Sequence, residues 1–79
     1  MFKSLNSPEN QRLISWLKQQ RGAQGLSMRA LAQRLDTHHS FVGKVEQGER
    51  RLDVIEFLQY CEALDASPIA AIRYVQNGS

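Results

Sequence analysis

The side chains best suited to chemistry lie close together, within residues 37–44. Ser40 supplies a hydroxyl group and Lys44 an ammonium group, and His38 and His39 supply imidazole rings that donate or accept hydrogen bonds according to their tautomer. Three chemistries use such groups: a hydroxyl nucleophile with an imidazole base, a metal site, or hydrogen bonding to a polar ligand. Their spacing, and the elements that carry them, must decide among these.

The spacing favours neither catalysis nor metal binding. Ser27, Ser40 and the two histidines match no known catalytic motif, and the chain has no glycine-rich phosphate loop. Neighbouring side chains on a helix diverge, and no cysteine or third histidine lies near His38 and His39 in the sequence to complete a zinc site. A chain of 79 residues also leaves little room for a pocket. We therefore expect no catalytic residue, metal, cofactor or small-molecule ligand, and no enzyme.

Two short amphipathic helices surround these side chains. Each has three apolar residues at helical spacing: Leu31, Ala32 and Leu35 in the first, and Phe41, Val42 and Val45 in the second. The break at residues 36–39 is too short for the two helices to lie antiparallel. This pattern predicts a helix-turn-helix, in which the second helix is free to enter a DNA major groove.

Capping signals set the bounds of these helices and of one before them. Ser7 and Pro8 start the first helix, because serine caps well and proline fits the first helical position. Ser27 caps the second helix, and Gly48 ends the third. The three helices expected in this half span about residues 8–21, 28–35 and 38–47.

Two more helices follow. Asp53 and Glu56 have the spacing of a capping box, so a fourth helix begins at Val54, with an apolar face through Phe57, Leu58, Cys61 and Leu64. Ser67 and Pro68 repeat the cap-plus-proline signal for a fifth helix. No segment alternates with period two, so we expect no strands. The sequence predicts an all-α fold of five helices, in a single domain over residues 1–79 with its core at about 8–75.

Composition and charge restrict the setting and the partner. The N-terminal residues 1–12 lack the apolar core of a signal peptide, no apolar run approaches the roughly 20 residues of a membrane span, and Cys61 is the single cysteine. We expect a bacterial cytoplasmic or nucleoid location and no membrane partner. Residues 1–51 carry nine Lys or Arg against four acids, whereas residues 52–79 carry one Arg against four acids. A basic half suits a polyanion, with the acidic half turned away from it.

The motifs LSxxxLAxxL at residues 26–35 and SFVxKVExGxR at 40–50, and the continuation LDVIEFLQYCEALDASP, resemble the lambda-repressor-like, Cro-type helix-turn-helix family, also called the XRE family. The resemblance covers about residues 12–75. It implies a small repressor-like transcriptional regulator that binds double-stranded DNA as a homodimer and reads a near-palindromic operator with its third helix. The alternative is a protein–protein interaction module that keeps this fold without binding DNA.

The resemblance also implies a role for each matching side chain. Base edges would be contacted by His39, Ser40 and Lys44. The DNA backbone would be contacted by Arg29, Thr37, His38, Gln47, Arg50 and Arg51. Arg21 and Glu46 would form a structural ion pair. Apart from the resemblance, Gly43 between Ser40 and Lys44 either lets the helix backbone approach the groove floor or is only tolerated at an exposed position.

Two positions depart from the family pattern, and one helix has two possible roles. Met28 stands where the family usually has a phosphate-binding glutamine, and Asp36 stands where the turn usually has glycine at positive φ. Asp tolerates that conformation better than most residues, so we expect the turn to survive. The fifth helix either forms the homodimer surface or completes the monomer core, through some of Ile69, Ile72, Tyr74 and Val75.

Overall fold

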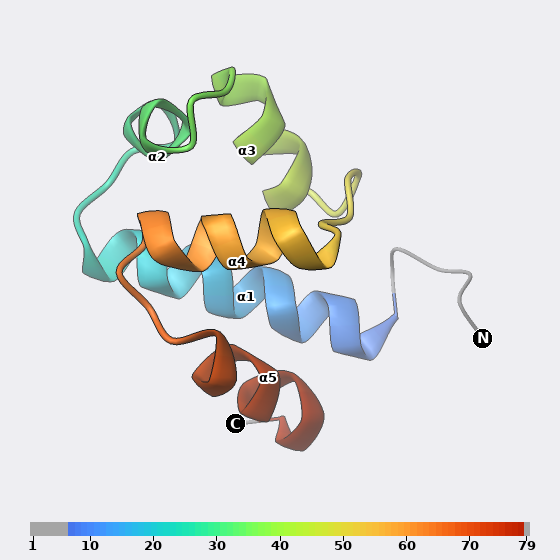
Figure 1. Ribbon diagram of the computed structural model, residues 1–79. Coiled ribbons are helices and arrows are strands. Elements are labelled where there is room, and N and C mark those ends of the chain that lie inside the picture. Colours follow the sequence, from blue (N-terminus) through green and yellow to red (C-terminus); the bar gives the residue numbers. More distant parts are fainter. Residues whose placement is uncertain (1–6, 79) are drawn as a thin grey trace.

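The computed structural model describes residues 7–78, and within that range it has five α-helices and no strand. They are α1 Pro8–Ala23, α2 Met28–Arg34, α3 His39–Glu46, α4 Val54–Ala63 and α5 Pro68–Asn77. The all-α, five-helix expectation is confirmed. Figure 1 shows α2 and α3 at one end and α5 at the other, with α1 and α4 between them.

Side chains cap the helices much as the sequence predicts. The hydroxyls of Ser7, Ser27 and Ser67 each accept a hydrogen bond from a backbone N–H three residues later. Asp53 and Glu56 form both halves of the capping box, with the Glu56 N–H 2.7 Å from Asp53 Oδ1 and the Asp53 N–H 2.9 Å from Glu56 Oε1. Such reciprocal bonds satisfy two backbone donors that the helix itself leaves unpaired.

Both α2 and α4 end in a turn with an aspartate in the left-handed region. Asp36 has φ 55° and Asp65 has φ 53°. The next residue in each turn closes it, because Thr37 N–H donates to Ala32 O at 2.9 Å and Ala66 N–H donates to Cys61 O at 2.9 Å. The turn between the helices of the helix-turn-helix therefore forms without glycine, as Asp tolerates positive φ.

The core lies where the five helices meet, and every helix contributes to it. Its buried residues are Trp16, Leu17, Leu31, Ala32, Val42, Val45, Tyr60, Cys61, Leu64 and Ala71. The prediction that Leu58 shares the buried face of α4 was wrong, since Leu58 is 45% exposed. The buried side of α4 is centred on Tyr60, Cys61 and Leu64, which leaves Leu58 at its edge.

Two arginine side chains tie distant helices together. Arg12 Nε of α1 donates to Val75 O of α5 at 2.8 Å, and Arg34 Nη1 of α2 donates to Ala63 O of α4 at 3.0 Å. Each bond satisfies a carbonyl in the last turn of a helix, where the helix supplies no partner. No helix within residues 7–78 is both long and apolar enough to cross a membrane. The expectation of no signal peptide concerns in part residues 1–6, which lie outside the described residues.

Candidate nucleic-acid interface

The helix α3 has one exposed and one buried side. Val42, Val45 and Glu46 are buried against the rest of the fold. His39, Ser40 and Lys44, the three expected base-contacting residues, are all exposed. Ser40 and Lys44 are four residues apart and so lie on the same side, one turn from each other. All three polar side chains are therefore exposed on one short helix, with Ser40 and Lys44 on the same side and His39 at its edge.

His38 is not part of α3 but caps it. Its Nδ1 accepts a hydrogen bond from the Ser40 N–H at 3.2 Å and lies 2.9 Å from Ser40 Oγ. The ring stacks on His39, with centroids 4.4 Å apart and an interplanar angle of 29°. Sequence reasoning assigned His38 to the DNA backbone and missed this cap, because histidine is not among the usual capping residues.

Gly43 leaves the exposed side of α3 unobstructed. A Cβ atom built at this position would meet no atom within 4 Å. No contact within the described protein therefore requires glycine here, although glycine costs a helix interior about 1 kcal/mol relative to alanine.

An ion pair between Arg21 and Glu46 lies on the buried side of α3. Arg21 Nε lies 2.6 Å from Glu46 Oε2 and Nη2 lies 2.9 Å from Oε1, a bidentate geometry, while Nη1 donates to Leu26 O at 2.9 Å. The Glu46 side chain is 2% exposed and that of Arg21 is 19% exposed. The hydrogen bond to Glu46 raises the pKa of Arg21, so the guanidinium stays charged. One side chain thus joins α1, the α1–α2 loop and α3.

The core holds two further titratable groups, Tyr60 and Cys61. Burial raises the pKa of the Tyr60 phenol, and its Oη has no hydrogen-bond partner among the described residues. Burial raises the pKa of the Cys61 thiol to about 11. Cys61 therefore stays a neutral thiol near pH 7 and is unsuited to nucleophilic chemistry.

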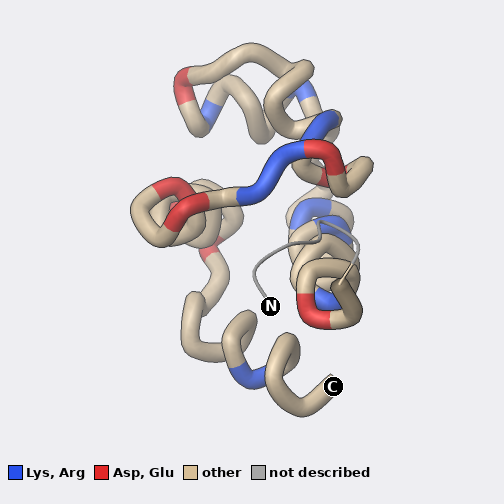
Figure 2. The backbone as a smooth tube through the Cα atoms, turned by 90° about the vertical axis from the view of Figure 1, so that its right-hand side faces the viewer, with Lys and Arg blue, Asp and Glu red and all other residues tan. Residues whose placement is uncertain are grey.

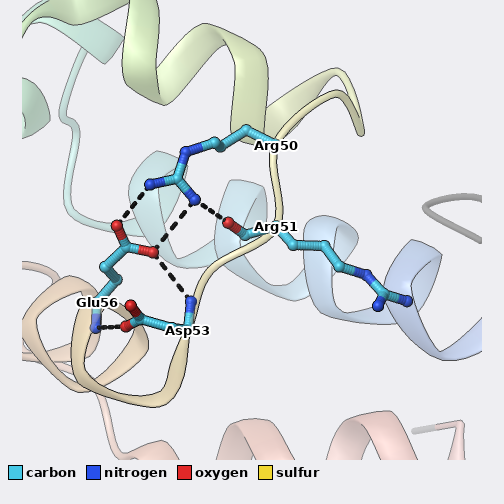
Figure 3. A network of polar contacts seen from close by, with 4 residues as sticks. All are labelled: Arg50, Arg51, Asp53 and Glu56. Atoms are coloured by element: carbon cyan, nitrogen blue, oxygen red, sulfur yellow. Dashed lines mark hydrogen bonds and ion pairs between the residues drawn. The ribbon is translucent and has the colours of Figure 1, made fainter. Parts of the chain in front are cut away.

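Arg50 is held by its own chain in the α3–α4 loop (Figure 3). Its Nη2 lies 2.6 Å from Glu56 Oε2, Nη1 lies 3.2 Å from Glu56 Oε1, and Nη1 also donates to the Arg51 carbonyl. The guanidinium lies over the Phe41 ring, 5.0 Å from its centroid. Arg50, Asp53 and Glu56 therefore form one cluster. The Glu56 carboxylate in it also accepts the Asp53 N–H at the start of α4.

This cluster changes the electrostatics of the loop. The hydrogen bond from Arg50, and then the backbone N–H of Asp53, lower the pKa of Glu56 below its ordinary value of 4.5. Near pH 7 the Arg50 charge is thus accompanied by a carboxylate on α4. Sequence reasoning placed Glu56 in the cap but missed its second role, because a contact across a six-residue separation depends on the path of the loop.

The remaining expected backbone contacts lie around α3. Arg29 is exposed in the first turn of α2, Thr37 is exposed in the α2–α3 turn, and Gln47 is the exposed C-cap of α3. Arg51 is exposed and its side chain extends away from the Arg50–Glu56 cluster (Figure 3). Figure 2 shows the basic stretch of the α3–α4 loop with an acidic stretch on either side of it. The acidic half is therefore not wholly turned away from the basic loop.

Met28 stands where the family usually has a phosphate-binding glutamine, and it does not pack into the core. Its side chain is 38% exposed at the first position of α2. A thioether has no strong hydrogen-bond donor or acceptor, so this position offers a phosphate only the backbone N–H groups of the helix start.

A second surface lies on α4 and α5, away from α3. Five large apolar side chains there are 45–72% exposed: Val54, Ile55, Leu58, Ile69 and Ile72, which we call the α4–α5 apolar face. A groove of about 380 Å³ between the two helices is lined in part by Val54, Leu58 and Ile72. Ala71 is buried and Tyr74 packs against the core, so α5 both completes the monomer core and leaves an apolar side open.

The described residues also bear on metal binding. Within residues 7–78, no group of three or more His, Cys, Asp or Glu side chains is placed to hold a metal ion. His38 and His39 stand together, but their rings stack on each other.

Comparison with known proteins gives a consistent set of relatives. A family model described as helix-turn-helix matches residues 17–70. Among solved structures, the chain is similar to an XRE-family like protein from Pseudomonas syringae pv. tomato str. DC3000, with 38% identity and a TM-score of 0.83 over 90% of this chain and 87% of that one. A search of curated proteins gives no match.

Two further structures extend the comparison. The restriction-modification controller protein C.AhdI from Aeromonas hydrophila is 34% identical, with a TM-score of 0.70 over 75% of this chain and 86% of that one. The clp gene regulator ClgR from C. glutamicum is 20% identical, with a TM-score of 0.77 over 86% of this chain and 88% of that one, which shows a shared fold.

Proposed function

The chain belongs to the XRE-like helix-turn-helix family, and from that premise we propose that it is a small transcriptional regulator that binds double-stranded DNA in a sequence-dependent manner. The observation that carries the proposal is the exposed side of α3. Ser40 and Lys44 lie on it one turn apart, with the exposed His39 at its edge, while the opposite side of the same helix is buried. A helix held in this way by a helix-turn-helix can enter the major groove and present side chains to base edges.

The chemistry of these side chains suits base edges. Lys44 can donate to the O6 and N7 atoms of guanine, and Ser40 can bond to several bases. Gly43 lies between them with open space at its Cβ position, which allows the helix backbone to come close to the groove floor.

Backbone contacts would come from the rim of this surface. Arg29, Thr37, Gln47 and Arg51 are exposed around α3, and His38, which is also exposed, can contribute through its Nε2. Lysine and arginine contacts to phosphate supply affinity and salt dependence, but no direct sequence information. Arg50 is a weaker candidate than its position in the sequence suggests, because Glu56 already accepts its hydrogen bonds.

The operator would be a near-palindrome read by a homodimer. The α4–α5 apolar face exposes large side chains that a monomer gains nothing by leaving in water, and a twofold dimer would cover the same patch on both copies. Two recognition helices would then meet half-sites roughly 34–36 Å apart. A second copy of the chain is thus the occupant we propose for this face.

Binding-site selection on random double-stranded DNA tests the function. The wild-type chain should enrich a defined motif with twofold symmetry, and the variant Lys44→Glu should lose that enrichment because it places a carboxylate against the bases. The exposed change Gln59→Glu on α4 introduces a carboxylate away from α3, and the exposed change Lys18→Glu on α1 matches the full change in net charge, so both serve as controls. If the wild-type chain retains no DNA, the protein–protein module becomes the better reading.

Sedimentation equilibrium tests the dimer separately. Wild-type protein should show a concentration-dependent dimer, whereas Ile72→Glu should remain a monomer with an unchanged helical circular dichroism spectrum. Gln59→Glu again controls for added charge. A monomer at all concentrations, together with an asymmetric selected motif, would contradict the homodimer without touching the DNA-binding proposal.

A further inference from the structure

We propose that His38 is a positioning residue that fixes the Ser40 hydroxyl as a hydrogen-bond acceptor, so that Ser40 selects an exocyclic amino group, that of adenine or cytosine, in the major groove. This inference rests on the proposed DNA-binding function and specifies what one residue of that surface reads. It narrows the role of Ser40, whose hydroxyl in general can either donate or accept.

One hydrogen bond to His38 determines the tautomer of its ring. The Ser40 backbone N–H lies 3.2 Å from His38 Nδ1 in hydrogen-bonding geometry. A backbone N–H can only donate, so Nδ1 must be the acceptor and carries no proton. The neutral ring therefore has its proton on Nε2. The stacked His39 ring, 4.4 Å away between centroids, packs against the imidazole in this orientation.

The tautomer of His38 in turn determines the direction of the hydrogen bond between His38 and the Ser40 hydroxyl. Ser40 Oγ lies 2.9 Å from the same Nδ1 atom. Because Nδ1 has no proton, the hydroxyl is the donor, and both donors share one imidazole lone pair. The hydroxyl hydrogen is then directed at His38, and the remaining lone pairs of Oγ face outward from an exposed position.

Base edges in the major groove present a pattern of hydrogen-bond donors and acceptors. Adenine N6 and cytosine N4 present amino donors there, whereas guanine O6 and N7 and thymine O4 are acceptors. A hydroxyl that already donates its hydrogen bond to His38 can accept one from an amino group, but it cannot donate to a second acceptor. Lys44 on the same side of α3 has only donors and so reads acceptors such as those of guanine. The two residues would thus read opposite polarities one helical turn apart.

Two measurements test this inference, and the first needs no DNA. Long-range proton–nitrogen correlation spectra of the full chain, with ¹⁵N-labelled histidine, report which imidazole nitrogen carries the proton. The expected result for the neutral His38 ring is a proton on Nε2 and none on Nδ1. Protonation at Nδ1 would overturn the proposal whatever the protein does with DNA.

The second measurement uses the selected operator with each position replaced by all four bases. One position should prefer adenine or cytosine by about threefold to tenfold, the range of a single neutral hydrogen bond, and Ser40→Ala should remove this preference. His38→Ala frees the hydroxyl to donate and should reduce the same preference. His38→Asn should restore it, because the asparagine side-chain oxygen is also a good helix-capping acceptor.

Thermal unfolding of each variant shows whether a change in DNA binding results only from a loss of folded protein. A purely structural role for His38 would lower the affinity for all four bases equally, and that result would overturn the proposal. A preference for guanine or thymine at the Ser40-dependent position would also overturn it. Failure of the wild-type chain to select any DNA would instead contradict the proposed function, while the tautomer measurement would still stand on its own.

Discussion

The guanidinium of Arg21 meets the carboxylate of Glu46 with two parallel hydrogen bonds, Nε to Oε2 at 2.6 Å and Nη2 to Oε1 at 2.9 Å. The Glu46 side chain is 2% exposed, whereas that of Arg21 is 19% exposed. The pair lies directly behind the exposed side of α3, and Arg21 also bonds the Leu26 carbonyl in the loop before α2. The orientation of the exposed side of α3 thus depends on a charge pair whose two members differ in their access to water.

That difference predicts an asymmetry between variants. Arg21→Ala should lower the free energy of unfolding by on the order of 3 kcal/mol, because it leaves a buried carboxylate without a partner. Glu46→Ala should cost less, since Arg21 can turn toward water. Urea unfolding of both variants measures the difference. The double variant Arg21→Met, Glu46→Leu should be more stable than Arg21→Ala, and a double variant that is less stable would contradict this account.

The sequence predicts those parts of the fold that depend on local signals. Serine caps, the capping box of Asp53 and Glu56, and the tolerance of Asp36 for positive φ are properties of short segments, and the structure has them as expected. The rotation of a helix about its axis depends on all its neighbours. For that reason the apolar spacing predicts Leu58 on the buried side of α4, whereas the structure leaves it 45% exposed.

The candidate site divides in the same way. The helical spacing of Ser40 and Lys44 is enough to place them together. The second partner of Glu56 depends on a loop that brings Arg50 back toward α4, and the cap at His38 depends on which imidazole nitrogen faces Ser40. Neither relationship follows from spacing, because both depend on side-chain orientation and tautomer.

A base contact and a phosphate contact predict different losses. Lys44→Ala should weaken operator binding by about 1–3 kcal/mol and relax the preference at one base pair. Arg29→Ala should weaken binding to all sequences similarly and lower the salt slope by about 1. Fluorescence anisotropy on the operator, its single-base variants and an unrelated duplex measures both. An equal loss on every duplex for Lys44→Ala would make that residue a phosphate contact instead.

The Arg50–Glu56 pair predicts that removing an acid strengthens DNA binding. Glu56→Gln should raise affinity at low salt and steepen the salt dependence, because Arg50 loses the carboxylate that now offsets its charge. Arg50→Ala should lower the salt slope by less than Arg29→Ala does. The control is Glu62→Gln, which removes an exposed acid from the other end of α4. If Arg50→Ala and Arg29→Ala lower the slope equally, the ion pair does not shield Arg50.

The same carboxylate predicts a pH-dependent stability. Hydrogen bonds from Arg50 and from the Asp53 backbone lower the pKa of Glu56 below 4.5, so its contribution to folding is fully present above that pH. The contribution should disappear as pH falls through the lowered pKa, when the carboxylate protonates. Thermal unfolding of wild type and Glu56→Gln from pH 7 to pH 3 should show a stability difference that closes at acid pH. A difference that stays constant below pH 4.5 would exclude this pair as its source.

Gly43 predicts opposite effects on folding and on binding. Its Cβ position is open, so Gly43→Ala should stabilise the fold by about 1 kcal/mol through helix propensity alone. If the proposed interface is correct, the same methyl group would stand between α3 and the bases and would hold the backbone away from the groove floor, so operator affinity should fall. Gly22→Ala is the matched control, because Gly22 also has open space at its Cβ, lies in α1 and has no positive φ. It should raise the unfolding temperature and leave affinity unchanged. If Gly43→Ala stabilises the protein and binds DNA as well as wild type, the glycine is merely tolerated and α3 does not approach the groove floor at this point.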